Sequence, residues 1–597
     1  DGETAELAPD PYLGSGVTPS LSSAFRDLSP LRDTLPELDP LLCSGCGDCW
    51  SRCPDGAVGA LALNPASVLD TSIGHTGADA LRPLAAKLAT QIVNQCATAG
   101  NESRMFAELL QGAWAWLQER MPLPAERGQR IGAAVGELGE ATDALPVVAA
   151  EPFFAHATQA ASRDAALLFL AINPDACKGC GICVAACEPG ALTGAAQTRR
   201  SLRDARHRWQ QWQRLPDTDR ATLQRIGAHA DPGPLATLLL TRANSASLAG
   251  GDAAEPGSGE RLAVRLAMAI AESRQRPALD RFLGEVDALR EKISLLIRET
   301  LADALPADDL DALERGLDTV ESRQAELGTL IASVEQSLGG GIDIPRLRRL
   351  VQLARDLGDL IWRLREGPLG IGRARLGLVF SADAIAEWSA NFPDNPFATP
   401  VVVDPGGDAL AMAVGLLQGQ LRQSTAAFGL VRRARHELQQ AQATHASATA
   451  SPQALRWDQL SMQEREVCPP LLVVGGDGLL RGDGLSQIDR LLKSDLPIRL
   501  IVLNQAGLDL PAQDAPDAAL AGPNELDLAL LALTRRHSYV AQTSIGEPDH
   551  LTHSLRGALA AAGPALVHLH APSPSRHGFA PMQTVARAQQ AVDLRQS

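Results

Sequence analysis

Aromatic residues are scarce in this chain: they make up 4% of the sequence, which contains only two tyrosines. Because strands favour aromatic and β-branched residues, this composition favours helix-rich packing over a β-sandwich. The sequence also lacks any run of about 18 consecutive apolar residues, the length that a membrane-spanning helix requires. The N-terminal residues have neither the basic nor the apolar region of a secretory signal peptide. We therefore expect a cytoplasmic protein that does not associate with a membrane.

Basic residues are fewer than acidic residues in this chain. The formal net charge is −16 at pH 7, which argues against nucleic acid and anionic membranes as partners, since both bind basic surfaces. The length of 597 residues predicts several domains. The sequence begins with Asp1 rather than methionine, so we expect a trimmed terminus or the back part of a longer polypeptide.

Cysteine is rare, but its distribution is informative. Eight of the ten cysteines fall in two short segments, whereas a secreted disulfide framework would spread them along the chain. Closely spaced cysteines in an acidic chain of cytosolic type indicate a metal site. Cys96 and Cys468 lie outside the two segments, and we expect them to be small buried hydrophobic residues.

Both cysteine segments follow the spacing C-x2-C-x2-C-x3-C. In bacterial ferredoxins with this spacing, three cysteines of one segment and the last cysteine of the other hold each [4Fe–4S] cluster. Structural zinc is the alternative, but a zinc site needs only four ligands and no such register. We therefore predict two cluster sites, quartet 1 and quartet 2. Quartet 1 is Cys43, Cys46, Cys49 and Cys187, and quartet 2 is Cys177, Cys180, Cys183 and Cys53. The glycines between the cysteines are predicted to let backbone N–H groups approach the clusters; they are Gly45, Gly47, Gly179 and Gly181.

The first third of the chain is predicted to be an extended arm followed by a ferredoxin domain. Residues 1–40 are rich in Pro, Gly, Ser and Asp, and residues 41–200 contain both cysteine segments. Cys53 and Cys177 are 124 residues apart, which is far more than a compact ferredoxin needs. Apolar residues at helical spacing, such as Leu109 and Leu117, predict that residues 60–170 form a helical insertion in this domain.

Residues 276–370 are predicted to form a helical arm. Apolar residues at alternating three- and four-residue steps run from Leu279 to Leu296 and again from Leu310 to Leu338. This repeat is typical of a coiled coil. The short break at Pro306 predicts an antiparallel coiled-coil hairpin. We expect a structural arm, with docking of a partner as the alternative.

The C-terminal part is predicted to be an α/β domain. Short β-rich runs at 401–403, 471–474, 500–503, 539–543 and 566–569 alternate with helical segments, which is typical of a doubly wound parallel sheet. Gly476, Asp477 and Gly478 follow one strand, and Asn504 and Gln505 follow another. Ligands bind open parallel sheets at the carboxyl ends of strands. The spacing suits a thiamine diphosphate motif, in which Asp477 and Gln505 would bind Mg²⁺ on the diphosphate.

With these motifs the chain resembles the pyruvate:ferredoxin oxidoreductases and the wider 2-oxoacid:ferredoxin oxidoreductase family. The order of arm, two-cluster ferredoxin domain and thiamine-diphosphate-binding domain is similar to the C-terminal half of a single-chain member. Residues 537–540, 563–566 and 573–578 resemble the last strands of the family. The resemblance implies that residues 201–275 begin the thiamine-diphosphate-binding-like domain and that residues 371–597 complete it. The cofactor-binding residues that it implies are Gly257, Ser258, Gly259, Glu260, Gly476, Asp477, Gly478 and Asn504.

The sequence also departs from the family. Members hold a third cluster beside the thiamine, with cysteines in a Cys-x-x-Cys-Gly-Glu loop and a Ser-Pro-Cys turn. The similar positions here are Glu255, Ser258 and Ser575, so we expect the third cluster to be absent. The catalytic residues of this chain are unknown. In the family, the glutamate that activates thiamine lies in a pyrimidine-binding domain, so we expect a partner subunit to supply it together with the remaining domains.

These features predict the iron–sulfur subunit of a thiamine-diphosphate-dependent 2-oxoacid:ferredoxin oxidoreductase of the pyruvate synthase type. Its cofactors would be two [4Fe–4S] clusters, thiamine diphosphate and Mg²⁺. Electrons from decarboxylation of a small 2-oxoacid, with coenzyme A as a candidate co-substrate, would pass through the clusters to a ferredoxin or another carrier. The alternative is an electron-transfer and scaffold subunit whose thiamine-binding fold no longer binds the cofactor.

Overall fold

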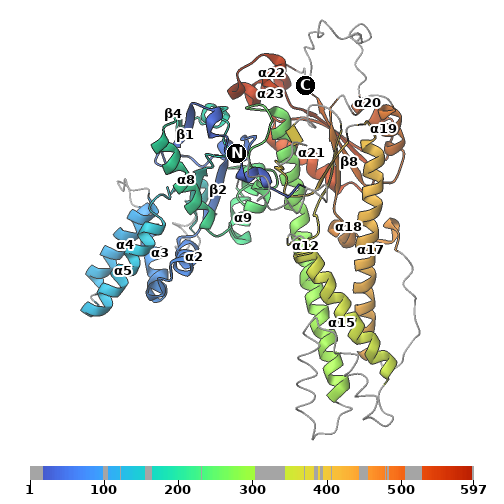
Figure 1. Cartoon of the computed structure of the whole chain (residues 1–597), viewed down its shortest axis with the longest axis horizontal. Coiled ribbons are helices and arrows are strands. Elements are labelled where there is room, and N and C mark those ends of the chain that lie inside the picture. The colour runs from blue at the N-terminus through green and yellow to red at the C-terminus, as the bar shows by residue number, and fades with distance from the viewer. Residues whose placement is uncertain are drawn as a thin grey trace, which may run out of the picture. The chain divides into compact units, whose positions relative to one another are not determined.

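The computed structural model forms two compact units (Figure 1). Unit 1 consists of Asp1–Ser273, Leu378–Ala413 and Leu471–Ser597, and unit 2 of Arg274–Gly377 and Val414–Pro470. The structure describes residues 18–97, 105–121, 123–154, 165–229, 231–302, 343–368, 370, 372–381, 388–389, 394–404, 406–442, 455–476, 479, 483–504 and 528–594. Within these residues, no helix is long and apolar enough to cross a membrane.

The two cysteine segments of unit 1 have the same local architecture. In each, a strand leads into the cysteine loop, and a short helix and a second strand follow. The first set is β1 (Thr34–Leu38), α1 (Asp48–Ser51) and β2 (Val58–Leu63), and the second is β3 (Leu167–Ile172), α7 (Ile182–Ala185) and β4 (Leu192–Ala196). β1 pairs antiparallel with β4, and β2 pairs antiparallel with β3. Each set therefore pairs with the other, which brings the two cysteine loops together.

The strand β1 was predicted to lie in the extended arm of residues 1–40, but it belongs to the cysteine-bearing part. The difference arises because Leu35 and Pro36 are buried against this part of unit 1. Before β1, residues from 18 onward contain two short 3₁₀ helices, η3 (Ser22–Phe25) and η4 (Ser29–Leu31). Residues 1–17 lie outside the described residues.

Helices occupy the chain between β2 and β3. They are α2 (Pro65–Thr76), η5 (Asp79–Leu84), α3 (Ala85–Ala97), α4 (Phe106–Arg120), α5 (Ala125–Ala141) and α6 (Glu151–Phe154). Their apolar faces share one core with β2 and β3. The following helix, α8 (Arg199–Arg214), closes this core with Trp212, whose indole Nε1 donates to the carbonyl of Phe169 at 3.1 Å. Gly59 makes room for this indole, since a Cβ there would lie 2.7 Å from the ring.

The C-terminal part of unit 1 contains a six-stranded sheet in the order β6-β5-β7-β8-β10-β9. Its strands are β5 (Gly377–Phe380), β6 (Val401–Val403), β7 (Leu471–Gly475), β8 (Ile498–Asn504), β9 (Tyr539–Ser544) and β10 (Ala565–His570). The pairs β5–β6, β7–β8, β8–β10 and β9–β10 are parallel. The prediction of an α/β fold with a parallel sheet is therefore confirmed.

Helices lie between the strands in the chain and pack against them. α19 (Gly484–Leu492) connects β7 to β8, and α20 (Leu528–Leu533), α21 (Pro548–Ala560) and α23 (Thr584–Asp593) contact the strands at the β9 end of the sheet. The register pairs His570 with both Asn504 and Ser544. The carboxyl ends of β8, β9 and β10 therefore meet at one edge of the sheet, where ligands bind in folds of this class.

Unit 2 is built from long helices around a single apolar core. These are α12 (Gly259–Ala302) from Arg274 onward, α15 (Ile344–Arg365), α17 (Ala409–Gln442) from Val414 onward, and the short α18 (Met462–Val467). The stripe of α12 that contains Val286 and Ile293 was predicted to pair with residues 310–338. Among the described residues it packs in a core with Leu357 of α15 and Val431 of α17. Residues 303–342 lie outside the described residues, so the second arm of the predicted hairpin is not seen.

The boundary of the α/β part also differs from the prediction. Residues 371–597 were predicted to be one α/β domain, but Val414–Pro470 belong to unit 2. The reason is the apolar face of α17, where Phe428 and Val431 are buried in the core of the helical unit. The pattern of apolar residues in α17 indicates a buried helix face but does not indicate which core receives it.

A core substitution tests the packing of the helical segment between β2 and β3. Ile92 of α3 is fully buried, and a large-to-small change at such a site costs about 2–5 kcal/mol. We expect Ile92→Ala to lower the thermal unfolding midpoint measured by circular dichroism. Thr90→Ala, at an exposed position of the same helix, should leave it nearly unchanged. Equal midpoints for the two variants would contradict the buried position of α3.

Candidate iron–sulfur site

The cysteine loops turn through glycines in left-handed backbone conformation. Gly45 and Gly47 have φ of 76° and 91°, and Gly179 and Gly181 have φ of 71° and 79°. Residues with a side chain rarely adopt such angles. At Gly47, in addition, a Cβ would lie 2.4 Å from the Cβ of Ala236. The loop geometry therefore depends on glycine at the positions that the sequence singles out.

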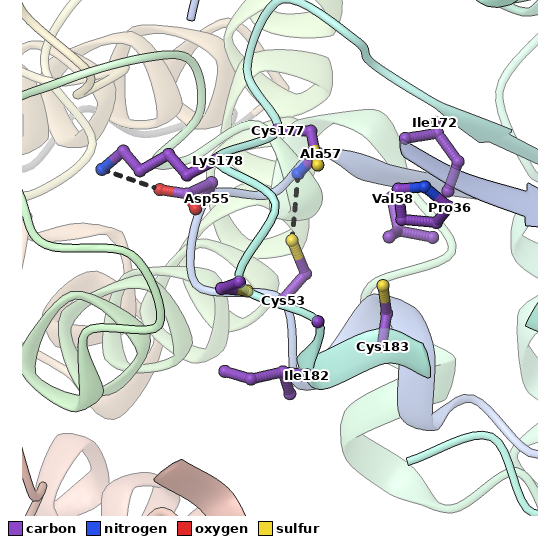
Figure 2. A pocket seen from close by; sticks show the side chains of 12 residues that line it. Pro36, Cys53, Asp55, Ala57, Val58, Ile172, Cys177, Lys178, Ile182 and Cys183 are labelled. Atoms are coloured by element: carbon purple, nitrogen blue, oxygen red, sulfur yellow. Dashed lines mark hydrogen bonds and ion pairs between the residues drawn. The ribbon is translucent and has the colours of Figure 1, made fainter. Parts of the chain in front are cut away.

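The structure brings each predicted quartet of cysteines together. All four cysteines of quartet 1 line one cavity, with Trp50, Leu170 and Leu192 among its other walls. All four of quartet 2 line a second cavity, in which Figure 2 shows the sulfur atoms of Cys53, Cys177 and Cys183 directed towards a common space. In both cavities the fourth cysteine comes from the opposite segment, as the ferredoxin spacing predicts.

In each quartet the cysteine thiols line the walls of a cavity and are not grouped around a single metal position. Within the described ranges, no group of three or more His, Cys, Asp or Glu residues is arranged to hold a single metal ion. A cubane offers one iron to each of four separate sulfurs, so its ligands must be spread around a cavity. The walls of both cavities have this arrangement of thiols.

Burial makes the free thiols difficult to ionise. It raises the pKa of Cys43 to about 11, and the neighbouring Cys46 and Cys187 add to the rise. Burial also raises the pKa of Cys177 to about 11, although Arg32 opposes the shift. At neutral pH the free side chains of Cys43 and Cys177 are therefore thiols, and a metal that binds them must displace protons. The donor set fits an iron–sulfur cluster, which binds cysteine as the thiolate.

Backbone N–H groups point at several of the sulfurs. Ala57 donates to the sulfur of Cys53 at 3.3 Å, and Gly179 donates to that of Cys177 at 3.4 Å. In quartet 1, Leu192 donates to the sulfur of Cys187 at 3.3 Å. Hydrogen bonds of this kind stabilise charge on cluster sulfurs and help to set the reduction potential.

A network of buried charges lies beside quartet 2. Lys178, the residue after Cys177, places its Nζ 3.1 Å from Asp55 and 2.8 Å from Asp252. Arg261 of α12 contacts the same two carboxylates, at 3.3 Å and 2.5 Å. The side chains of all four are at most 3% exposed. Burial alone would raise the pKa of Asp252, but Arg261 and Lys178 hold it below its usual value.

The sequence alone does not reveal this network. Lys178 and Asp55 stand close to cysteines in the sequence, and that proximity is the one signal that could have indicated them. Asp252 and Arg261 lie more than 60 residues beyond the last cluster cysteine, so only the fold reveals their position.

Quartet 1 lies closer to solvent than quartet 2. Cys46 is exposed and Cys43 is partly exposed, whereas Cys53, Cys177 and Cys183 are buried. Leu41 and Leu42, immediately before Cys43, are each 52% exposed. Quartet 1 therefore lies at a surface that another molecule can approach.

The residues predicted for thiamine diphosphate fall at the carboxyl edge of the sheet where the structure describes them. Gly476 follows β7 and Asn504 ends the adjacent β8. The backbone oxygen of Asn504 accepts from Ala571, which follows β10. Asp477, Gly478 and Gln505 lie outside the described residues, so the predicted Mg²⁺ ligands are not seen.

The predicted diphosphate loop, Gly257 to Glu260, lies near the same edge but is packed with protein. A Cβ on Gly259 would lie 2.3 Å from the carbonyl oxygen of Pro572, and one on Gly257 would lie 2.7 Å from that of Pro581. Ser258 Oγ accepts from the N–H of Arg261 at 3.2 Å and so caps α12. Glu260 is buried. These contacts give the loop a packing role, and its binding of a diphosphate stays a prediction.

Glu255, which the sequence resemblance aligned with a cluster cysteine, accepts hydrogen bonds from the turn that contains Ser573 and Ser575. Its Oε1 accepts from Ser573 Oγ at 2.5 Å, and its Oε2 accepts from the backbone N–H of Ser575 at 2.9 Å. The segment of Glu255 and the turn at Ser573 and Ser575 are therefore in contact in the structure. Here a carboxylate joins them through hydrogen bonds.

Replacement of one cysteine tests the quartets. If quartet 2 holds a cubane, Cys183→Ser should remove about four irons per chain and leave about four in quartet 1. Cys96→Ser is the matched control, because Cys96 is buried in α3 and lines neither cavity. Iron and sulfide analysis of protein purified without oxygen measures both. Equal iron contents in the two variants would show that Cys183 is not a ligand.

Comparison with known families supports an iron–sulfur site. Residues 169–192 match the model of a family described as a 4Fe-4S binding domain. The matched segment runs from β3 through Cys177, Cys180, Cys183 and Cys187 to the start of β4. No curated protein matches the chain. The chain therefore contains a 4Fe-4S binding domain, which indicates an iron–sulfur electron-transfer role.

Proposed function

We propose that the chain is an electron-transfer subunit with two [4Fe–4S] clusters, one in each cysteine-lined cavity. The observation that carries this proposal is the exchange of the fourth cysteine, which gives each cavity a complete set of four thiols. A cluster takes up and releases single electrons when bound. The chain supplies the thiolates, the N–H donors to sulfur and the buried surroundings that tune it.

We infer that the two cavities lie close enough for electrons to pass from one proposed cluster to the other. The helices α1 and α7, which follow the two loops, pack against each other, and Cys49 of quartet 1 raises the pKa of Cys183 in quartet 2 after the larger effect of burial. Quartet 2 lies towards the sheet, since α7 packs against η11 (Pro581–Gln583), which follows β10. Exposed Cys46 supports quartet 1 as the end that exchanges electrons with a ferredoxin or another carrier.

We propose in addition that the subunit works in a thiamine-dependent 2-oxoacid oxidoreductase. The specific observation in favour is the parallel sheet, in which Gly476 and Asn504 stand at the ends of adjacent strands. A partner subunit would supply the activating glutamate and the remaining domains, and the substrates would be a small 2-oxoacid and coenzyme A. The packed loop at Gly259 supports the alternative, in which the sheet serves as a scaffold without the cofactor.

The two-cluster proposal predicts the iron content and the magnetic spectrum of the whole chain. Anaerobically purified protein should contain about eight irons and about eight sulfides. After reduction with dithionite, electron paramagnetic resonance should show two [4Fe–4S] signals that broaden each other, because the cavities adjoin. Four irons with a single unbroadened signal would contradict the second cluster.

The thiamine proposal predicts a dependence on Asp477. The sequence offers a matched control, because Gly-Asp-Gly occurs again with Asp483 at its centre. We expect calorimetry to show Mg²⁺-dependent binding of thiamine diphosphate to the purified complex, abolished by Asp477→Ala and retained in Asp483→Ala. No binding to the wild-type complex at millimolar thiamine diphosphate would support the scaffold alternative.

A further inference from the structure

Arg265 is a buried arginine that forms no ion pair with a carboxylate among the described residues. It lies one helical turn after Arg261 on α12 and is fully buried. Its Nη1 donates to the carbonyl oxygens of Trp50 at 3.1 Å and Cys53 at 3.0 Å. These acceptors belong to the first cysteine segment, so the guanidinium lies against the residue that quartet 2 takes from that segment.

The remaining nitrogens of this guanidinium have no partner. Within the described part of the chain, the N–H groups of Arg265 at Nε and Nη2 donate to no hydrogen-bond partner, and no carboxylate forms an ion pair with the residue. Gly56 leaves the space that the guanidinium occupies, since a Cβ there would lie 3.2 Å from Nε. A buried and unbalanced cation is unfavourable. Its presence indicates that an anion absent from the polypeptide completes the site.

A cluster in quartet 2 would supply that anion, because a cubane held by four thiolates has a net negative charge in both oxidation states. Arg265 already lies against the segment that supplies Cys53 to this site, because its Nη1 donates to the carbonyl oxygen of Cys53.

The two cavities differ in the charges around them. Among the described residues, three buried cations, Lys178, Arg261 and Arg265, stand beside quartet 2 against two buried carboxylates, Asp55 and Asp252. Arg32, which donates to the carbonyl of Cys177, lies near Asp27 and Asp175. Near quartet 1 the carboxylates are in excess, with Asp48 and Glu188 against Arg52. Charges in a buried site interact several times more strongly than in water. Reduction adds one electron to a cluster, so it is favoured where positive charge is in excess.

We propose that Arg265 raises the reduction potential of the cluster in quartet 2, so that this buried cluster is reduced before the cluster in quartet 1. The inference rests on the proposed two-cluster electron-transfer function. The step is a one-electron reduction in which the donor loses one electron, the cubane gains one, and no bond is made or broken. Arg265 takes no part in the electron transfer itself. It is a positioning residue, which places a positive charge beside the cluster. Exposure of quartet 1 to water opposes the difference, but Lys178, Arg261 and Arg265 beside quartet 2 are buried, so solvent screens their charges little.

Redox titration of the whole chain, followed by electron paramagnetic resonance, tests the inference. Arg265→Gln should lower the potential of one cluster and change the electron distribution between the clusters about tenfold, which is about 59 mV for a one-electron couple. Arg265→Lys keeps the charge and should recover most of the shift. Arg499→Gln is the matched control, because Arg499 is a buried arginine of β8 that donates to the carbonyls of Ala561 and Gly563. It should leave both potentials unchanged.

A second measurement does not depend on the folding of an Arg265 variant. Cys183→Ser should leave the quartet 1 cluster alone, and its potential should match the lower of the two wild-type values. A match to the higher value would overturn the inference, as would an Arg265→Gln protein with about eight irons and unchanged potentials. Fewer than about eight irons in the wild-type chain would instead overturn the two-cluster function on which the inference rests.

Discussion

Two buried carboxylates hold the cysteine-bearing part of unit 1 to the start of α12. Asp55 and Asp252 each contact both Lys178 and Arg261, so three segments that are remote in sequence meet at one point. Buried charges are tolerated only when each has its partners, and removal of one partner typically costs about 3–5 kcal/mol. The geometry of quartet 2 depends on these ion pairs, because Lys178 is adjacent to Cys177 and Asp55 is two residues from Cys53. The same ion pairs hold the first turn of α12, and the next turn carries Arg265.

The sequence predicted the parts of the site that depend on local spacing. The cysteine register is a short-range pattern, and the grouping that it predicts is that of the cysteines lining each cavity, including the exchange of Cys53 and Cys187. The alternation of strands and helices likewise predicted the parallel sheet. The long-range partners could not be predicted, because they depend on tertiary packing. Examples are the pairing of β1 with β4, the burial of α17 in the helical unit, and the charges around quartet 2.

The contact between Glu255 and the Ser573–Ser575 turn connects the resemblance to the fold. In the family that the sequence resembles, the corresponding segments carry cysteines of a cluster, whereas in this chain a carboxylate, a hydroxyl and a backbone N–H join them. Hydrogen bonds therefore connect the two segments, and these bonds carry no electrons. In the proposed path, quartet 2 is the site on the side of the sheet, and the predicted absence of a third cluster would leave an electron donor to reach it directly.

The exchange of the fourth cysteine also has a consequence for how the protein is made. Neither quartet is complete until the second cysteine segment has left the ribosome, because quartet 1 needs Cys187 and quartet 2 needs Cys177, Cys180 and Cys183. The 124 residues between Cys53 and Cys177 take roughly 6–25 s to synthesise at about 5–20 residues per second. During that time the four thiols of the first segment are without the cysteines of the second, and the intervening helices are without β3 and α8, with which they share a core. In the proposed two-cluster function, cluster delivery and completion of this core would therefore both follow synthesis of the second segment.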